Sequence, residues 1–321
     1  MDFFTDAPIH PSSCKTYNSK LNEWISFMPE HFQTIVCVLS FPDLAMKILQ
    51  THLKCNTNTN RHIYIVAIMS YIRHHFKELA EYLTDDHVTL LRARWIAINN
   101  DNEAPIIQRR LENKPTAIQE RKGGSRISFE QIVSKRDELA PGSIERVLLC
   151  MYTMIPPVRA DYFTTQLVHG ETAVPTEKNY IRILTDGTME STLTDFKTAS
   201  VFGRIVNLFP PELAQEIRLS LEKHPREYLF LNARGKPHTR NSFTLWSRRV
   251  LSRIFETDFT LVFFRHAFST HYMITHHHTI TDAQIKEISD KMGHSAEMFK
   301  AYRWIQGLPS EDPVDSDEEK E

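Results

Sequence analysis

The chain has 321 residues, of which 41% are hydrophobic and 10% aromatic, so it is long and apolar enough to bury the cores of about two globular domains. Its formal net charge is -2, but positions 311–321 hold seven acids and one lysine, so the remainder carries -2 minus -6, which is +4, and a polyanionic partner is not excluded. The four cysteines form no CxxC pair and no apolar run approaches about 20 residues, which argues against a disulfide framework, a cysteine zinc site and a membrane span.

The first hundred residues show apolar side chains at helical spacing. This spacing predicts an all-α unit from residue 12 to about residue 115. The expected helices cover Thr16–Met28, His31–Leu39, Asp43–Leu53, Ile63–Leu83 and Val88–Ile98.

Between residues 99 and 126 the helical spacing dissolves into NNDNEAP and then NKPTAIQERKGGSR, and Gly123 with Gly124 predicts a break in the chain. We expect the domain boundary here, with residues 116–128 as a basic linker. From Arg109 to Arg126 six basic residues stand against two acids. This stretch either lies along a phosphate backbone or is simply a solvated linker.

A second unit of mixed α/β character is expected from residue 129 to residue 307. The alternation in Asn179–Leu184, the turn at Asp186 and Gly187, and the segment that runs back towards Lys197 predict an antiparallel hairpin. Residues 308–321 are acidic and lack aromatic side chains, which predicts a disordered tail. Helices are expected over Ser143–Met154, Pro211–Lys223, Arg240–Phe255, Arg265–Ile274 and Thr281–Met292.

Four short motifs hold the residues that suggest a chemical function. Arg159 follows a helix break in PPVRADYF, Lys197 ends a strand in TDFKTAS, Arg265 lies near a helix start in FRHAFSTHYM, and KMGHSAEMFKAYRW supplies His294 and Tyr302. In order and spacing these motifs resemble the carboxy-terminal catalytic domain of tyrosine recombinases. Each residue alone could be a surface, capping or packing residue, but five in the same order over about 140 positions are hard to obtain by chance.

The resemblance covers about Phe129–Gly307, and the helical region before it is similar in position to the core-binding domain of that family. It implies a mainly α-helical fold with a small antiparallel sheet. Residues 12–115 would form a helical, SAM-like core-binding domain that clamps DNA, and residues 129–307 the mixed α/β catalytic domain. The motifs RADY, DFKTASVFG and MGHSAEM look closest to recombinases of large DNA viruses and eukaryotic mobile elements.

The resemblance implies a site-specific DNA recombinase or integrase that cuts and rejoins strands through a 3′-phosphotyrosine at Tyr302. Arg159 and Arg265 would clamp the phosphate, because planar and permanently charged guanidinium groups suit the negative charge that grows on its oxygens. Lys197 would protonate the 5′ leaving oxygen, and His294 would hydrogen-bond a phosphate oxygen or accept the tyrosine proton. No metal or other cofactor is implied, because the covalent intermediate stores the bond energy.

One position departs from the family pattern. Members commonly have a histidine three residues before the second arginine, where this chain has Val262. His266 is adjacent to Arg265, but successive helical residues point about 100° apart, so it cannot simply substitute. We expect Val262 to face the scissile phosphate rather than to pack in the core, and we expect Asp161 to support Arg159.

The run His276–His278, with His266 and His271 nearby, raises the alternative of a zinc site. Adjacent histidines on a helix splay around it, and no cysteine or carboxylate completes a site at a familiar spacing. A polar loop is the preferred interpretation, and no metal ligand is assigned.

Binding of double-stranded DNA requires basic side chains on both domains. The resemblance also implies a homo-oligomer, a tetramer, on the DNA, with no membrane partner. The cysteine usage and the absence of a leader-like amino terminus predict an intracellular protein of the nucleus or cytoplasm that is not secreted. The candidates for DNA contacts are Arg109, Arg110, Lys114, Arg121, Lys122, Lys236, Arg240, Arg248 and Arg249.

Two alternatives stay open. A type IB topoisomerase uses a similar clamp, lysine and tyrosine but nicks one strand at a time. A catalytically impaired, DNA-binding derivative of a recombinase would tolerate the valine at position 262, although the presence of all five motif residues argues against it.

Overall fold

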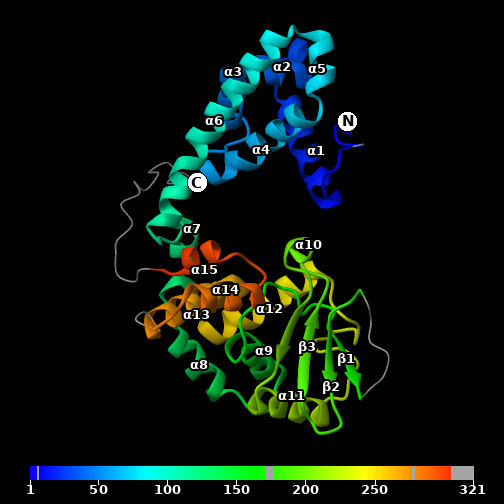
Figure 1. The fold of residues 1–321 in the computed structure, drawn as a ribbon, viewed down its shortest axis with the longest axis vertical. Helices are drawn as coiled ribbons and strands as arrows, with labels where there is room; N and C mark the ends of the chain where they lie inside the picture. Colours follow the sequence, from blue (N-terminus) through cyan, green and yellow to red (C-terminus); the bar gives the residue numbers. More distant parts are fainter. Residues whose placement is uncertain (6, 171–176, 277–278, 305–321) are drawn as a thin grey trace. The chain divides into compact units, whose positions relative to one another are not determined.

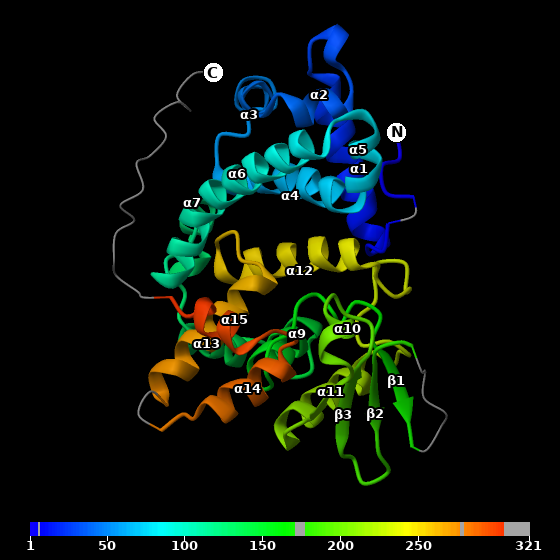
Figure 2. The same cartoon turned by 45° about the horizontal axis from the view of Figure 1, so that its top comes forward.

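The computed structural model describes the chain except for residues 6, 171–176, 277–278 and 305–321, so the predicted acidic tail lies outside the described residues. The chain divides into two compact units, Met1–Arg110 and Leu111–Glu321. Figures 1 and 2 show helices in the first unit, and helices together with a small sheet in the second. The expectation of a mainly α-helical protein with a small sheet is confirmed.

The core of the N-terminal unit includes the fully buried Trp24 and Trp95, whose rings meet edge to face with centroids 5.8 Å apart. Each indole N–H donates to a backbone carbonyl, that of Ala45 for Trp24 and that of Leu39 for Trp95, at 3.0 Å in both cases. The helices around this pair are α1 (Pro11–Ser26), a 3-10 turn (Glu30–Phe32), α2 (Ile35–Ser40), α3 (Pro42–Thr51), α4 (Asn58–His74), α5 (Phe76–Tyr82) and α6 (Asp85–Leu111).

Two predicted helices of this unit are each divided in the structure. The expected helix His31–Leu39 is interrupted at Thr34, whose extended backbone and side chain cap α2 by accepting a hydrogen bond from the Cys37 N–H. The expected helix Ile63–Leu83 ends at His75 and continues as α5. In both cases the hydrophobic pattern runs across a cap, so the pattern alone gives one helix where the chain forms two elements.

Helix α6 is much longer than the predicted Val88–Ile98 and contains Pro105 in its interior. The segment NNDNEAP was expected to end the helix and does not. Asn58 and Asn102 explain this in part, because each donates its side-chain amide to the other's backbone carbonyl, at 3.1 and 2.9 Å, and so fastens α6 to α4. These tertiary hydrogen bonds offset the one that an internal proline removes.

The C-terminal unit is built around α9 (Ile144–Thr153), in which all seven residues from Val147 to Thr153 are buried. The predicted linker is not free of structure, because it contains α7 (Ala117–Arg121) and a 3-10 turn (Gly124–Arg126). The other helices are α8 (Phe129–Glu138), α10 (Ala199–Phe202), α11 (Pro211–Lys223), α12 (Arg240–Phe255), α13 (Leu261–Thr275), α14 (Asp282–Lys291) and α15 (Ala296–Tyr302).

The sheet has four strands in the order β1 (Gln166–His169), β2 (Tyr180–Ile183), β3 (Met189–Leu193) and β4 (Ile205–Leu208). The predicted hairpin is confirmed, since β2 and β3 pair antiparallel around Gly187, which has a positive φ of 84°. The sheet as a whole is mixed rather than antiparallel, because β1 pairs with β2 in parallel. Figure 1 shows the sheet on one side of this unit and α13, α14 and α15 on the other.

Candidate active site

Arg265 lies in the second turn of α13, which begins at Leu261 and not at Arg265 as predicted. Its side chain is fully buried, and its Nη1 donates to the carbonyls of Pro157 (3.1 Å) and Met292 (2.9 Å). Its Nε and Nη2 are buried and have no hydrogen-bond partner among the described residues. Burial lowers the pKa of Arg265, an effect that nearby Tyr302 opposes. The buried guanidinium therefore has two nitrogen atoms whose hydrogen bonds are not made within the described structure.

His294 is 3% exposed and lies between α14 and α15. Its Nδ1–H donates to the carbonyl of Ser295 at 2.9 Å, which leaves Nε2 as a buried acceptor without a partner in the described structure. Burial, followed by the positive charge of Arg265, lowers the pKa of His294 to about 3. The ring is therefore neutral near pH 7.

Gly293 brings His294 into this position. Its φ is +66°, and a Cβ added there would lie 3.2 Å from Phe196 and 3.3 Å from Ile205. Both the backbone conformation and the close packing therefore favour glycine. The Gly293 carbonyl accepts hydrogen bonds from Arg159 Nη1 (3.3 Å) and from Thr198 Oγ1 (2.8 Å), so a single carbonyl joins two of the predicted site segments.

Arg159 is held by its backbone. Its carbonyl accepts a 2.6 Å hydrogen bond from the Tyr152 hydroxyl, and its N–H donates to Asp161 Oδ2 at 3.1 Å. Asp161 thus supports Arg159 through the main chain, whereas its other oxygen pairs with the guanidinium of Arg240 at 2.6 Å. The Arg240 guanidinium also lies over the ring of Phe163, 4.7 Å from the centroid.

Tyr302 is the last residue of α15 and is half-buried. The Arg265 guanidinium carbon lies 5.1 Å from the centre of its ring, and the ring of His294 lies 5.3 Å away, centroid to centroid. Arg265 and His294 therefore both lie beside the Tyr302 ring, and Arg159 is connected to this group through its hydrogen bond to the Gly293 carbonyl.

His266 contacts the backbone of Tyr302, which the sequence did not predict. Its Nδ1–H donates to the Tyr302 carbonyl at 2.9 Å, and its ring stacks on Trp304 at 3.8 Å between centroids. Burial lowers the pKa of His266 to about 3, so the ring is neutral. It lies four residues after Val262, hence on the same helical face, and this spacing is the signal that could have drawn attention to it.

Lys197 lies in the turn between β3 and α10, and its side chain is exposed. It makes no hydrogen bond or ion pair in the part of the chain that the structure describes. Its neighbours are anchored beside the site, since Phe196 packs near Gly293 and Thr198 donates to the Gly293 carbonyl. The contacts of Phe196 and Thr198 therefore hold the backbone on both sides of Lys197, whereas the Lys197 side chain is exposed.

Val262 lies in the first turn of α13 and is 44% exposed. The alternative that it packs in the core is therefore wrong.

Several candidate DNA contacts are engaged within the protein. Arg248 forms a two-pronged ion pair with Asp258, at 2.6 and 2.7 Å, and Lys122 shares the same carboxylate at 3.1 Å. Lys114 pairs with Glu112 at 3.1 Å. Exposed positions are occupied by Arg110, Arg121, Lys236 and Arg249, whereas Arg109 is half-buried at the end of α6.

The histidines near position 276 do not form a cluster in the described residues. His271 pairs with Glu130 at 2.6 Å, and His276 stacks on Tyr272, while positions 277 and 278 lie outside the described residues. Within the described ranges, no three histidine, cysteine or acidic side chains come together as metal ligands, and no helix has the length and hydropathy to cross a membrane.

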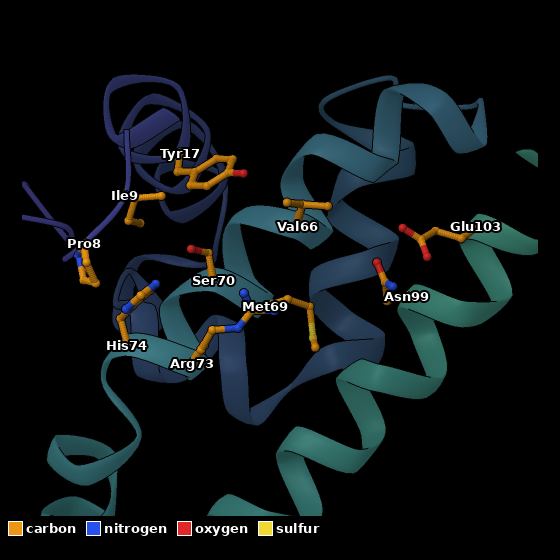
Figure 3. Close-up of a pocket in the computed structure, with 10 residues that line it drawn as sticks. All are labelled: Pro8, Ile9, Tyr17, Val66, Met69, Ser70, Arg73, His74, Asn99 and Glu103. Carbon is orange, nitrogen blue, oxygen red and sulfur yellow. The ribbon is translucent and has the colours of Figure 1, made fainter. Parts of the chain in front are cut away.

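The N-terminal unit contains a pocket of about 420 Å³ that is lined by residues of this unit. Figure 3 shows Tyr17, Arg73 and His74 on its wall, with Glu103 contributed by α6. None of the predicted catalytic residues lines it.

No protein-family model matches the chain, and no curated protein matches it. Among solved structures, the crystal structure of XerA recombinase is similar, with 12% sequence identity, coverage of 94% of this chain and 90% of that chain, and a TM-score of 0.36. A likeness this distant leaves the chemistry to be inferred from the side chains themselves.

Proposed function

We propose that the chain cuts and rejoins double-stranded DNA through a covalent 3′-phosphotyrosine at Tyr302, in the manner of a site-specific tyrosine recombinase or integrase. The observation that carries the proposal is the buried Arg265, with two nitrogen atoms unpaired next to a tyrosine ring. A buried donor without a partner costs about 1–3 kcal/mol, and more when it is charged. A phosphodiester, whose two non-bridging oxygens share a negative charge, is the ligand that would satisfy it.

In this proposal each residue has one task. Arg159 and Arg265 hold the non-bridging oxygens, and the neutral His294 accepts the proton of the Tyr302 hydroxyl at Nε2. The tyrosine oxygen bonds to phosphorus, and the bond from phosphorus to the 5′ oxygen breaks, with its electron pair going to that oxygen. Lys197 gives the 5′ oxygen a proton. Rejoining is the reverse, with a 5′ hydroxyl as the attacking group.

The basic residues outside the site would contact the DNA backbone. Arg110 and Arg249 are exposed, and Arg248 and Lys122 could exchange Asp258 for a phosphate. We extend the proposal to a homo-oligomer, a tetramer, on DNA, because exchange of strands between two duplexes needs a nucleophile for each strand. The likeness of its motifs to those of viral and mobile-element enzymes suggests the integration of mobile DNA.

The test is covalent capture from DNA of unspecified sequence. The full chain is incubated with randomised duplexes that are nicked at a series of positions, so that a short product diffuses away and rejoining fails. We expect protein-linked DNA after denaturation in detergent, and sequencing of this DNA gives the cleavage position. Joined products from two duplexes would distinguish recombination from simple relaxation of supercoils.

Tyr302→Phe should abolish this capture and leave DNA affinity unchanged, because only the nucleophilic oxygen is removed. The matched control is Tyr272→Phe in α13, which loses a hydroxyl of the same kind from a tyrosine that is not one of the proposed catalytic residues and should retain capture. An adduct that persists in Tyr302→Phe, or no adduct from the unmodified chain, contradicts the proposal.

A further inference from the structure

The side chain of Asn179, which directly precedes β2, is fully buried and uses every hydrogen-bonding group of its amide. Its Nδ2 donates to the carbonyls of Asp161 (2.7 Å) and Asp195 (2.9 Å). Its Oδ1 accepts from the N–H groups of Thr194 and Asp195, both at 2.8 Å. Two donors and two lone pairs are the whole capacity of an asparagine side chain, and all four are used on backbone atoms.

The two segments that Asn179 joins are those on which the proposed chemistry depends. Asp161 follows Arg159 by two residues and binds its backbone N–H. Thr194 and Asp195 form the start of the turn that carries Lys197. A single amide therefore ties the phosphate-clamping segment to the segment with the proposed general acid.

Lys197 depends on the hydrogen bonds of the Asn179 amide more than the other site residues do. Arg265 and His294 are buried and hydrogen-bonded, whereas the Lys197 side chain is exposed and has no partner of its own in the described part of the chain. A lysine is a compact charge on a flexible four-carbon stem, so its reach is determined by where its backbone is held. Asn179 holds the turn before Lys197, and Thr198 holds it after, by its bond to Gly293.

We propose that Asn179 is a positioning residue for strand cleavage: it fixes the turn from which Lys197 delivers a proton to the 5′ leaving oxygen. This inference rests on the proposed function. Asn179 itself does not touch the DNA. Asn179→Asp would place an oxygen against the carbonyls of Asp161 and Asp195, so that two donated hydrogen bonds become repulsive contacts while the accepted bonds can remain.

Changing the leaving group from oxygen to sulfur distinguishes a residue that positions the proton donor from one that is merely structural, because only a defect in proton delivery is rescued. In the ordinary reaction the 5′ oxygen departs with the electron pair of its bond to phosphorus and needs a proton. When that bridging oxygen is replaced by sulfur, the departing thiolate is stable without a proton, because a thiol has a pKa of about 8.5. A defect that lies only in proton delivery is therefore rescued by the sulfur substrate.

The experiment uses the full chain and the duplex identified by covalent capture, made with either oxygen or sulfur at the scissile 5′ position. Lys197→Ala should cleave the oxygen substrate about 10²–10⁴ times more slowly than the unmodified chain, the range for loss of a general acid. Asn179→Asp should lose about 10²-fold, as expected for a misplacement of about 1 Å. On the sulfur substrate both variants should come within a few-fold of the unmodified chain.

Asn207→Asp is the matched control, since Asn207 is a buried asparagine of β4 that pairs with Ser191 in the sheet and whose Nδ2 has no hydrogen-bond partner among the described residues. It should cleave both substrates at the unmodified rate. If Asn179→Asp does not fold, as its melting curve would show, Asn179→Ser replaces it, because serine removes the amide without adding a charge.

The outcomes separate this inference from the proposal on which it rests. No adduct from the unmodified chain overturns both. If the sulfur substrate does not restore cleavage by Lys197→Ala, Lys197 is not the general acid, and the positioning role of Asn179 is overturned as well. If Lys197→Ala is rescued and the Asn179 variant is equally slow on both substrates, or is as fast as the unmodified chain on both, cleavage at Tyr302 stands and the positioning role of Asn179 is overturned.

Discussion

The two units bury their largest side chains in opposite ways. In the N-terminal unit these are Trp24 and Trp95, and each gives its one N–H to a backbone carbonyl. In the described part of the C-terminal unit the largest fully buried side chain is Arg265, and two of its nitrogen atoms have no partner. An indole has one donor to satisfy, whereas a guanidinium has five.

The N-terminal core therefore serves only to stabilise the fold. The C-terminal core also contains a side chain that we propose takes part in the reaction. A position that served only packing would be filled at lower cost by an apolar side chain, because burial of an unpaired charge is unfavourable. In the C-terminal unit Arg265 is accompanied by His294, whose buried Nε2 is also unpaired. Substitutions in the first unit should therefore change stability, and substitutions around Arg265 should change chemistry.

The largest effect is expected from Arg265→Met. We expect covalent capture of DNA to fall by at least about 10³-fold, because the charge that stabilises the transition state is lost. Inorganic phosphate should raise the melting temperature of the unmodified chain by about 2–4 °C at ten times its dissociation constant.

Phosphate also stabilises proteins in general, so Arg226→Met serves as the control. Arg226 is a partly buried arginine of the same unit with its own hydrogen bonds to Leu229 and Ser220. The phosphate shift should persist in that variant and shrink in Arg265→Met. Equal shifts in both would mean that Arg265 does not bind the anion.

Trp24→Phe should act on stability alone. It removes the hydrogen bond to Ala45 and leaves a void in the N-terminal core, which should lower the free energy of unfolding by about 2–4 kcal/mol. Denaturant unfolding measures this loss, and single-turnover cleavage at saturating DNA should remain unchanged. Phe27→Leu, at a position 44% exposed, should change stability by less than about 0.5 kcal/mol. If Trp24→Phe slowed the chemical step as much as Arg265→Met does, the distinction between the two units would be contradicted.

Acid should destabilise the C-terminal unit through His266. Its pKa is about 3 in the folded chain and 6.5 in the unfolded chain, so the unfolded state binds more protons between these values. The stabilisation is complete above pH 6.5 and is lost as the pH falls towards 3, by about 2 kcal/mol at pH 5. Melting curves should show a shallower pH dependence for His266→Phe. His224→Phe, at an exposed position of the same unit, should keep the original slope. An unchanged slope in His266→Phe would contradict the buried, neutral histidine.

The smallest effect is expected from Val262→His. Because position 262 is exposed, the imidazole is not forced into the core and the melting temperature should hardly change. If the position faces the scissile phosphate, one hydrogen bond to a charged group should accelerate cleavage about tenfold. A stable variant that cleaves more slowly would show that this position lies elsewhere in the site.

The hydrophobic pattern predicted the helices and strands that are stabilised by residues close to them in the sequence. The β2–β3 hairpin follows from the turn at Asp186 and Gly187, where Thr188 donates to Asp186. The sequence predicted only part of helix α6, Val88–Ile98, because the helix continues past Pro105 with the support of a pair of hydrogen bonds to α4. Strands β1 and β4 have four residues each, and neither is flanked by an Asp-Gly turn like the one that identified the equally short β2.

The candidate site shows the same division. The residue types and their order gave Arg159, Arg265, His294 and Tyr302, and the structure brings these four together. Asp161 was expected to support Arg159 and does so, through the Arg159 backbone N–H, but its ion pair with Arg240 was not predicted.

The sequence by itself determined which reactive side chains the chain carries, and it did so because a charged, nucleophilic or proton-donating group is a property of the residue. Only the tertiary structure decided which of these groups are left with unmet hydrogen bonds, since pairing depends on neighbours that are distant in the chain. Arg265 is one arginine among many until Pro157 and Met292 take one of its nitrogens and leave two unpaired beside Tyr302. Asn179 has no distinguishing pattern until the fold brings the backbones near Arg159 and Lys197 to the two sides of its amide.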